Sequence, residues 1–235
     1  QKSTAPERHL FQVYFLCGGT NMNSKAKRIT TIAMLCAISY AVMAVGRVPV
    51  VLFLKYDPKD VIITLGGLIW GPFTAFIVSV IVSFIEMFSV SDTGIIGCVM
   101  NILSTCAFAC TASIIYKKKH SLAGATTGLL AGCLVMTSVM LIWNYLITPF
   151  YMGYPREAVA ELLLPAFLPF NLIKSGLNAA FTFLLYKPVI TALRKSGYLS
   201  ASGQSPRRRH TGMILFSVTV AVTCILLILS MNGIL

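Results

Sequence analysis

Seven long apolar stretches divide this chain of 235 residues. They lie at about residues 29–46, 57–71, 72–90, 96–116, 121–148, 165–187 and 212–231. Most approach the roughly 20 apolar residues that cross a bilayer core as a helix, and only 11% of all residues are charged. This pattern excludes an ordinary soluble domain and predicts an all-α membrane protein, with a compact bundle of six transmembrane helices and one extra C-terminal transmembrane helix. The second stretch is short, so we expect that helix to be tilted and partly buried, or the bilayer to thin around it.

The chain is expected to have four segments. Residues 1–21 lack the apolar pattern, whereas Met22 opens a charged start to the first helix. Because Gly18-Gly19 can be encoded by a purine-rich run of the kind that binds the bacterial ribosome, we interpret residues 1–21 as a non-native or disordered extension; a secretory signal peptide is the alternative, although its three-part pattern is not visible. The other segments are a six-helix membrane domain at 22–195, a basic cytoplasmic linker at 196–211 and the additional helix at 212–235.

The basic residues indicate how the chain crosses the membrane. The formal net charge is +12, and most Lys and Arg residues gather at 25–28, 117–119 and 187–209. The segments on the opposite side carry only Arg47, Lys55, Lys59 and Arg156. This bias fits the positive-inside rule for a multi-pass protein of a bacterial cell membrane with a cytoplasmic N-terminus. Membrane lipid is therefore an expected partner, and nucleic acid is not, because the chain lacks a basic surface interleaved with aromatic residues.

A polar stripe marks the apolar stretch at 165–187. Asn171, Lys174 and Asn178 recur at i, i+3 and i+7 and so share one helical face. A charged side chain in the apolar part of a membrane helix is unfavourable, so it usually faces a bundle interior or an aqueous cavity and has a function. Asn171 and Lys174 are therefore the leading site candidates, with packing inside the bundle as the alternative.

Three further polar side chains fall at the same depth, namely Glu86, Asn101 and Asn144. With the orientation given by the basic segments, all five candidates lie in the outer halves of four helices, where we expect them to line a cup open to the outside. A mostly apolar cavity with a few convergent polar groups is typical of small-molecule sites. Amides and a lysine suit an uncharged heteroaromatic ligand better than an anion. For each asparagine, hydrogen bonding between helices remains the alternative.

The segment from Gly46 to Asp60 is apolar but is interrupted by Pro49 and Pro58. Non-helical backbone at membrane depth must be buried in protein or line a cavity, so we expect this loop to fold back over the bundle as a lid. Asp57 is expected to be the N-cap of the next helix, with Pro58 at the first helical position and Asp60 near the positive end of the helix dipole. The alternative is a membrane transferase that uses Asp57 and Asp60 with a divalent metal.

Ala33, Ala37 and Ala41 are spaced by four residues along the first helix. Such a face permits close helix contact, either within the bundle or with a partner protein. The sequence contains no P-loop, metalloprotease or serine-hydrolase motif, so an ATP-driven process would need a partner. The seven Cys residues lack the spacing of a zinc site or a disulfide framework, and neither a metal nor a resident cofactor is expected.

Three segments carry a resemblance to a known family. They are Leu54-Lys-Tyr-Asp-Pro-Lys-Asp60, Gly71-Pro72 after the short second helix, and Tyr151-MGYPREAVAELLLPAFLPFNLI-Lys174. Over about residues 24–195 the chain resembles the riboflavin-specific S component of energy-coupling factor (ECF) vitamin transporters. The resemblance implies a six-helix bundle that binds riboflavin near its outer face, with Asn171 and Lys174 in contact with the flavin.

The resemblance also implies roles for other segments. The loop after the first helix would act as a gate, through Val50, Lys55, Tyr56 and Asp57. The alanine-rich first helix, with Ala33, Ala37 and Ala41, would dock on a transmembrane T component that is itself coupled to two ATPase subunits. The seventh apolar stretch departs from the family, and we assign it no role.

We therefore expect a non-enzymatic substrate-binding subunit of an ECF-type ABC transporter, which captures riboflavin for uptake driven by partner ATPases. The expected ligand-binding residues are Leu54, Glu86, Asn101, Asn144, Asn171 and Lys174. An S component for another vitamin or a flavin-like ligand is the nearer alternative. The metal-dependent transferase is the more distant one.

Overall fold

The computed structural model of the chain describes residues 24–52, 54–91, 93–119, 121–195 and 211–231. The expectations for residues 1–21 and for the basic segment at 196–210 lie outside these ranges. The chain divides into two compact units, Gln1–Met34 and Leu35–Leu235. Helix α2 (Ser24–Gly46) crosses the boundary between them, and the bundle described below belongs to the second unit.

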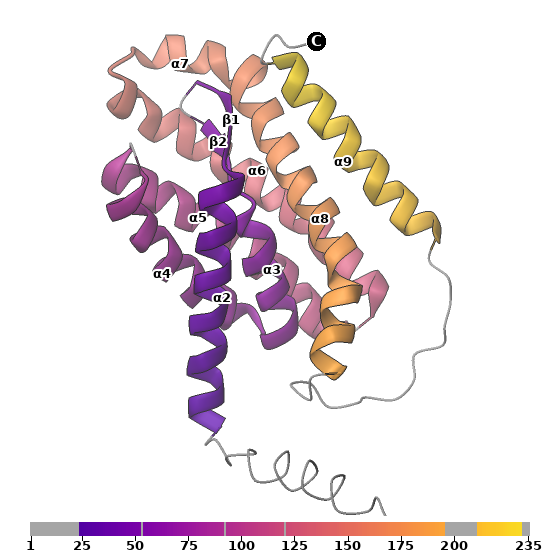
Figure 1. Ribbon diagram of the computed structural model, residues 1–235. Helices are drawn as coiled ribbons and strands as arrows, with labels where there is room; N and C mark the ends of the chain where they lie inside the picture. Colours follow the sequence, from indigo (N-terminus) through magenta and orange to yellow (C-terminus); the bar gives the residue numbers. More distant parts are fainter. Residues whose placement is uncertain (1–23, 53, 92, 120, 196–210, 232–235) are drawn as a thin grey trace, which may run out of the picture. The chain divides into compact units, whose positions relative to one another are not determined.

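The described part of the second unit is mainly helical (Figure 1). After α2, its helices are α3 (Lys59–Trp70), α4 (Pro72–Ser89), α5 (Gly94–Lys118), α6 (Leu122–Met152), α7 (Arg156–Leu162), α8 (Leu168–Lys195) and α9 (Thr211–Met231). Among the described residues, five helical segments are long and apolar enough to span a membrane: Ala26–Gly46, Pro72–Ser89, Gly94–Lys118, Ala123–Met152 and Arg156–Leu193. The chain is therefore a mostly helical, multi-pass membrane protein, but the expected count of six spanning helices plus one is not confirmed.

Helix α3 is short and buried, as the length of its apolar stretch predicts. Its 12 residues make a helix of about 18 Å at the usual rise, well under the roughly 30 Å of a bilayer core. Val61, Ile63 and Leu65 are buried in it. The turn into α4 uses Gly71 with a φ of 101°, which is a conformation that favours glycine, and Pro72 then begins α4.

The expected lid is a β-hairpin rather than an irregular loop. Strand β1 (Val48–Val51) pairs antiparallel with β2 (Leu54–Tyr56), and this pairing supplies backbone hydrogen bonds that an apolar environment cannot. The predicted N-cap of α3 is wrong, because Pro58 occupies the capping position and Asp57 precedes it. Asp60 does lie in the first turn of α3, as expected.

The polar stripe lies in a helix that begins earlier than residue 165. Helix α7 is followed directly by the π-helical turn η1 (Leu163–Phe167) and then by α8. Pro165 has no N–H to donate along the helix, which fits a locally wider turn at this position. The preceding helix also ends later than the expected residue 148, because α6 continues through Pro149 to Met152 before Gly153, with a φ of 67°, ends it.

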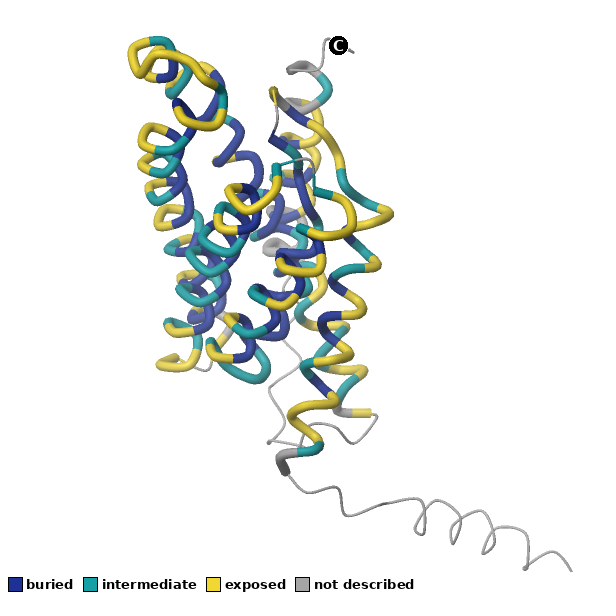
Figure 2. The backbone as a smooth tube through the Cα atoms, turned by 90° about the vertical axis from the view of Figure 1, so that its left-hand side faces the viewer, coloured by how far each residue is buried: buried dark blue, intermediate teal, exposed yellow. Residues whose placement is uncertain are grey.

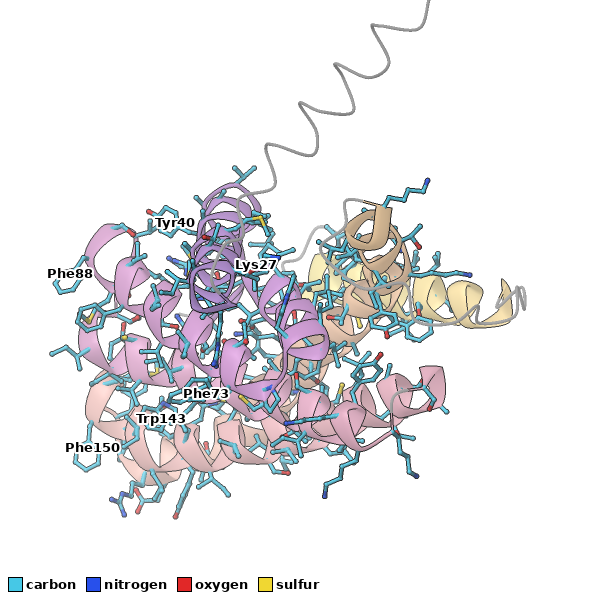
Figure 3. The ribbon with its side chains drawn as sticks, turned by 90° about the horizontal axis from the view of Figure 1, so that it is seen from below. Lys27, Tyr40, Phe73, Phe88, Trp143 and Phe150 are labelled. Carbon is cyan, nitrogen blue, oxygen red and sulfur yellow. The ribbon has the colours of Figure 1, made fainter. Side chains whose placement is uncertain are left out.

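Among the described residues of the second unit, apolar side chains gather in buried clusters, and two of these each join several elements. Figure 2 shows the buried positions on the inward sides of the helices. One cluster joins α3, α5 and α6 through residues such as Leu68, Phe108 and Met136. The other joins the hairpin to α8 and α9, which lie side by side (Figure 1). On the outside, the rings of Phe88 and Phe150 point away from the bundle (Figure 3), as expected for surfaces that face lipid.

Candidate functional site

A cavity of about 280 Å³ lies beneath the hairpin. Its walls come from the hairpin with the residues that flank it, from α4, from the α4–α5 connection, and from α5, α6 and α8. The lining residues are Arg47, Leu52, Leu54, Lys55, Asp57, Glu86, Ser91, Thr93, Met100, Asn101, Ser104, Met140, Tyr151, Phe170, Asn171 and Lys174.

The cavity lies at one end of the bundle. Ser91 and Thr93, which line it, precede the first residue of α5. The basic residues 117–119 lie at the other end of this 25-residue helix, about 36 Å away at the usual rise per residue. The cavity and the basic connection therefore lie at opposite ends of the bundle, as the sequence predicts for an outward-facing cup.

The structure brings together most of the predicted ligand-binding residues. Those that line the cavity are Leu54, Glu86, Asn101, Asn171 and Lys174. Asn144 is the exception, because it is fully buried in α6 and does not line the cavity. Its Oδ1 accepts a hydrogen bond from Thr148 Oγ1 of the same helix at 3.3 Å, and its Nδ2 has no hydrogen-bond partner among the described residues, so the alternative of hydrogen bonding between helices is not observed here.

The predicted gate residues divide between two environments. Lys55 and Asp57 line the cavity, whereas Val50 and Tyr56 belong to the apolar cluster shared with α8 and α9. Burial raises the pKa of the Tyr56 phenol, and the nearby carboxylates of Asp60 and Asp57 raise it further. Tyr56 therefore stays neutral and holds the hairpin to the bundle by apolar contact.

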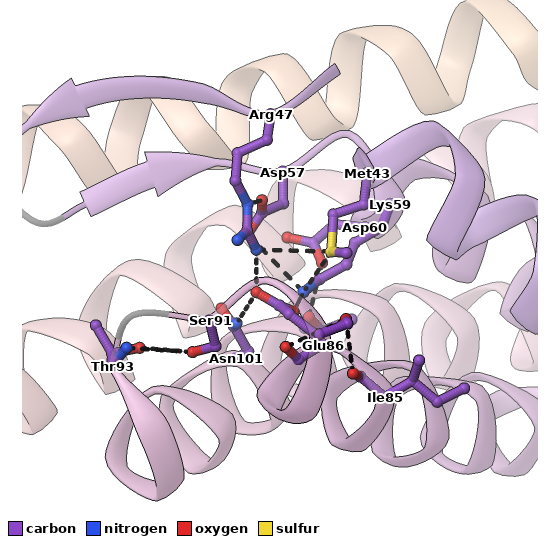
Figure 4. Close-up of polar contacts among 12 residues, drawn as sticks. Met43, Arg47, Asp57, Lys59, Asp60, Ile85, Glu86, Ser91, Thr93 and Asn101 are labelled. Carbon is purple, nitrogen blue, oxygen red and sulfur yellow. Dashed lines mark hydrogen bonds and ion pairs between the residues drawn. The ribbon is translucent and has the colours of Figure 1, made fainter. Parts of the chain in front are cut away.

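Glu86 is the centre of a buried charge cluster at the cavity wall (Figure 4). Its carboxylate accepts hydrogen bonds from Arg47 and Lys59, and from Asn101 Nδ2 at 2.9 Å. Arg47 Nε also donates to Asp57 Oδ1 at 2.6 Å, and Lys59 Nζ lies 3.8 Å from Asp57 Oδ2. The cluster thus links the two ends of the hairpin to α3, α4 and α5.

The ion pairs keep the cluster charged despite its burial. Burial alone would raise the pKa of Asp57, but the positive charges of Lys59, Lys174 and Arg47 outweigh burial and lower it. Burial would likewise lower the pKa of Arg47, yet its bonds to Asp57 and Glu86 raise it. Each buried charge is therefore compensated by an opposite charge, as a low-dielectric site requires.

A second buried carboxylate, Asp60, is the partner of two residues of the polar stripe on α8. Asn171, Lys174 and Asn178 are all buried, as their common helical face predicts. Lys174 Nζ lies 3.4 Å from Asp60 Oδ2, and Asn178 Nδ2 donates to the same oxygen at 3.4 Å. Thr105 Oγ1 donates to the other oxygen, Asp60 Oδ1, at 2.7 Å.

Two cavity-lining oxygens have no hydrogen-bond partner among the described residues. Asn171 Nδ2 donates to the carbonyl oxygen of Phe167 at 2.7 Å, which leaves Asn171 Oδ1 buried and unpartnered. Ser104 Oγ, on α5, is also buried and unpartnered. An unpaired buried polar atom costs about 1–3 kcal/mol, so these atoms mark positions where a bound ligand can supply hydrogen-bonding groups.

Comparison with known proteins identifies the family. Residues 27–186 match the family model described as "ECF transporter, substrate-specific component". The chain belongs to this family.

Relatives with similar sequences support the assignment of this chain to the family. The riboflavin transporter RibU of Staphylococcus aureus (strain TCH60) is 31% identical over 179 residues, which cover 72% of this chain and 93% of the relative. The riboflavin transporter FmnP of Bacillus subtilis (strain 168) is 29% identical over 188 residues, 73% of this chain and 98% of the relative. A solved S component of a bacterial ECF transporter has a TM-score of 0.62 and 30% identity, and the match covers 73% of this chain and 99% of that one.

Family membership argues against the transferase alternative. A substrate-specific component of a transporter binds its substrate without converting it. The geometry agrees, because Asp57 and Asp60 each pair with a cationic side chain, Arg47 and Lys174 respectively.

The sequence did not indicate that Arg47 and Lys59 belong to the site. The sequence indicates only that both belong to outer segments with few charges, yet Lys59 is fully buried and Arg47 lines the cavity. Their position in an apolar segment close to Asp57 and Asp60 was a usable signal, because a charge buried in such a segment needs an opposite charge nearby. Their common partner Glu86, 39 residues after Arg47, could not be deduced from this spacing.

The alanine face of α2 is accessible. Ala33, Ala37 and Ala41 are each exposed, so their side chains are available for contact with lipid or with another protein. The alternative of packing inside the same bundle predicts buried alanines. The exposure therefore favours an external contact surface for this substrate-specific component.

Proposed function

We propose that this chain captures riboflavin at the outer side of a bacterial cell membrane and passes it to an ECF transporter. One observation carries the proposal: the cavity presents an unpartnered acceptor, Asn171 Oδ1, and a buried cationic donor, Lys174 Nζ. A flavin ring edge carries an imide N–H between two carbonyl oxygens, so it offers one donor and two acceptors. This pattern complements an amide oxygen and an ammonium group.

The apolar part of the lining supports the same ligand. Leu54, Met100, Met140 and Phe170 line the cavity with Tyr151, and apolar walls suit a flat aromatic ring system. The positive charge of Arg47 is balanced by Asp57 and Glu86, so it does not impose an anionic ligand. Two relatives at about 30% identity carry the name riboflavin transporter.

The hairpin would act as the gate of this site. The cavity of about 280 Å³ lies just below the range of about 300 to 1,000 Å³ that is usual for ligand pockets. The ligand therefore needs additional room, which an outward movement of β1 and β2 provides. Leu52, Leu54 and Lys55 of the hairpin line the cavity and would close over the bound ring.

Transport would require partners with an ATPase. We place the N-terminus in the cytoplasm, because the basic residues then lie inside and the cavity faces outward. The exposed face of Ala33, Ala37 and Ala41 would dock on a transmembrane T component by close helix contact. That component would couple the chain to two ATPase subunits, since this sequence has no P-loop of its own.

A titration with purified protein in detergent tests the proposal. Flavin fluorescence should be quenched in a saturable manner at a one-to-one stoichiometry. Glu157→Gln is the control, because Glu157 is exposed on α7, and this variant should bind riboflavin as well as the wild type does. Competition with a panel of other vitamins then determines the ligand class. Absence of saturable quenching would refute riboflavin as the ligand, and stronger competition by another vitamin would establish the nearer alternative.

A further inference from the structure

Asp60 connects three helices below the ligand cavity. It lies in the first turn of α3, accepts a hydrogen bond from Thr105 of α5 and another from Asn178 of α8, and pairs with Lys174 of α8. Only 1% of Asp60 is exposed. Asp60 does not line the cavity, whereas Lys174 does.

We propose that Asp60 is a positioning residue for ligand binding, which holds the ammonium group of Lys174 at the cavity wall. This inference rests on the proposed function, because Lys174 is the donor assigned to the flavin. Asp60 acts through Lys174, since the cavity wall lies between the carboxylate and the ligand.

The geometry explains why such a residue is needed. A lysine side chain has four rotatable bonds and a compact charge that seeks water or an anion. Asp60 fixes the position of that charge from behind, at 3.4 Å from Nζ. The Thr105 hydroxyl, at 2.7 Å from Oδ1, fixes the carboxylate in turn. A donor held in this way meets the ligand without first losing rotamer freedom, which favours binding.

The arrangement also predicts how the residues of the stripe divide their roles. Asn171 lines the cavity, and its Oδ1 is free for the ligand. Asn178, one turn beyond Lys174, donates to Asp60 and does not line the cavity. The ligand should therefore contact Asn171 and Lys174 directly and should depend on Asn178 only through Asp60.

A double-mutant cycle tests the inference. Riboflavin affinity is measured for the wild type, Asp60→Asn, Lys174→Met and the double variant. Asp60→Asn should weaken binding about tenfold in the wild-type background and less than about twofold in the Lys174→Met background. Such a difference is within the range of interaction energies measured for residues in contact. The shift of the flavin absorption spectrum on binding should be lost in both single variants.

A milder pair of variants covers the case in which Asp60→Asn fails to fold. Thr105→Val removes one hydrogen bond to Asp60 while keeping size and charge, and should weaken binding about threefold. Thr137→Val is the matched control, because Thr137 is also buried but its hydroxyl has no hydrogen-bond partner among the described residues. Its affinity should equal that of the wild type.

The outcomes separate this inference from the proposed function. If the wild type does not bind riboflavin, the proposed function fails and the inference fails with it. If the wild type binds, but Asp60→Asn weakens binding equally with and without Lys174, or Thr137→Val weakens it as much as Thr105→Val does, then Asp60 has a general structural role and the inference alone is refuted.

Discussion

Replacing Glu86 by Gln should strongly destabilise the bundle. Six buried or nearly buried groups carry the charge of the cluster: the cations Arg47, Lys59 and Lys174 and the carboxylates Asp57, Asp60 and Glu86. Three positive and three negative charges balance. A glutamine keeps the size of Glu86 and can still accept from Asn101, but it leaves one positive charge in excess.

The magnitude follows from the contacts that remain. Removing one partner of a buried ion pair costs about 3–5 kcal/mol. Arg47 keeps its bond to Asp57, and Lys59 keeps a carboxylate oxygen of Asp57 and the Met43 sulfur, each at 3.8 Å. We therefore expect the free energy of unfolding to fall by about 3 kcal/mol, the low end of that range. For a chain of this size, this loss lowers the melting temperature by about 6–12 °C.

Thermal melting of purified protein in detergent measures the effect. Glu161→Gln is the control, because Glu161 is exposed on α7 and should melt with the wild type. The double variant Glu86→Gln/Lys59→Met restores equal numbers of the two charges, so it should recover much of the lost stability. A single Glu86→Gln variant that melts within about 2 °C of the wild type, less than 1 kcal/mol, would show that the charge balance of the cluster does not stabilise the fold.

Four further predictions concern binding, pH, assembly and the extra helix. Asn171→Ala should weaken riboflavin binding about tenfold to a hundredfold, since a ligand group loses its partner; a fluorescence titration that gives the wild-type affinity would remove Asn171 from the site. The lowered pKa of Asp57 means that its ionised form stabilises the fold above its ordinary pKa of about 4, and that this contribution is lost as the pH falls through the lowered value. The difference in melting temperature between the wild type and Asp57→Asn should therefore have its largest value at pH 7 and decrease below about pH 4. A difference that does not change with pH would contradict this. Ala37→Trp should leave riboflavin binding intact but block co-purification with the T component and uptake by cells, because close helix contact needs small residues; normal uptake would place the docking surface elsewhere. Gly176→Leu should lower the melting temperature by an overpacking cost of about 1–3 kcal/mol, because even a Cβ at Gly176 lies 3.3 Å from Cys224 Sγ of α9; an unchanged melting temperature would mean that α9 does not pack closely on α8.

Periodicity and hydropathy alone determined the local features of the protein. The apolar stretches located the helices, because a spanning segment must satisfy its backbone and bury its length in lipid. The spacing of Asn171, Lys174 and Asn178 placed all three on one buried face of α8, because helical geometry fixes which residues share a side. The proline-interrupted segment before Asp60 was also recognised as a non-helical cover, although not as a hairpin.

Only the tertiary structure decided which buried polar groups meet. Arg47 and Glu86 are 39 residues apart, and Asp60 and Asn178 are 118 residues apart, so no local pattern pairs them. Their pairing depends on how α3, α4, α5 and α8 pack together. The same packing moved Asp57 from its predicted capping role to a bond with Arg47 and left Asn144 outside the cavity wall. From the sequence one can predict that a charge buried in the membrane needs a partner. Which residue becomes the partner depends on distances of a few ångströms between segments that meet only after the bundle has folded.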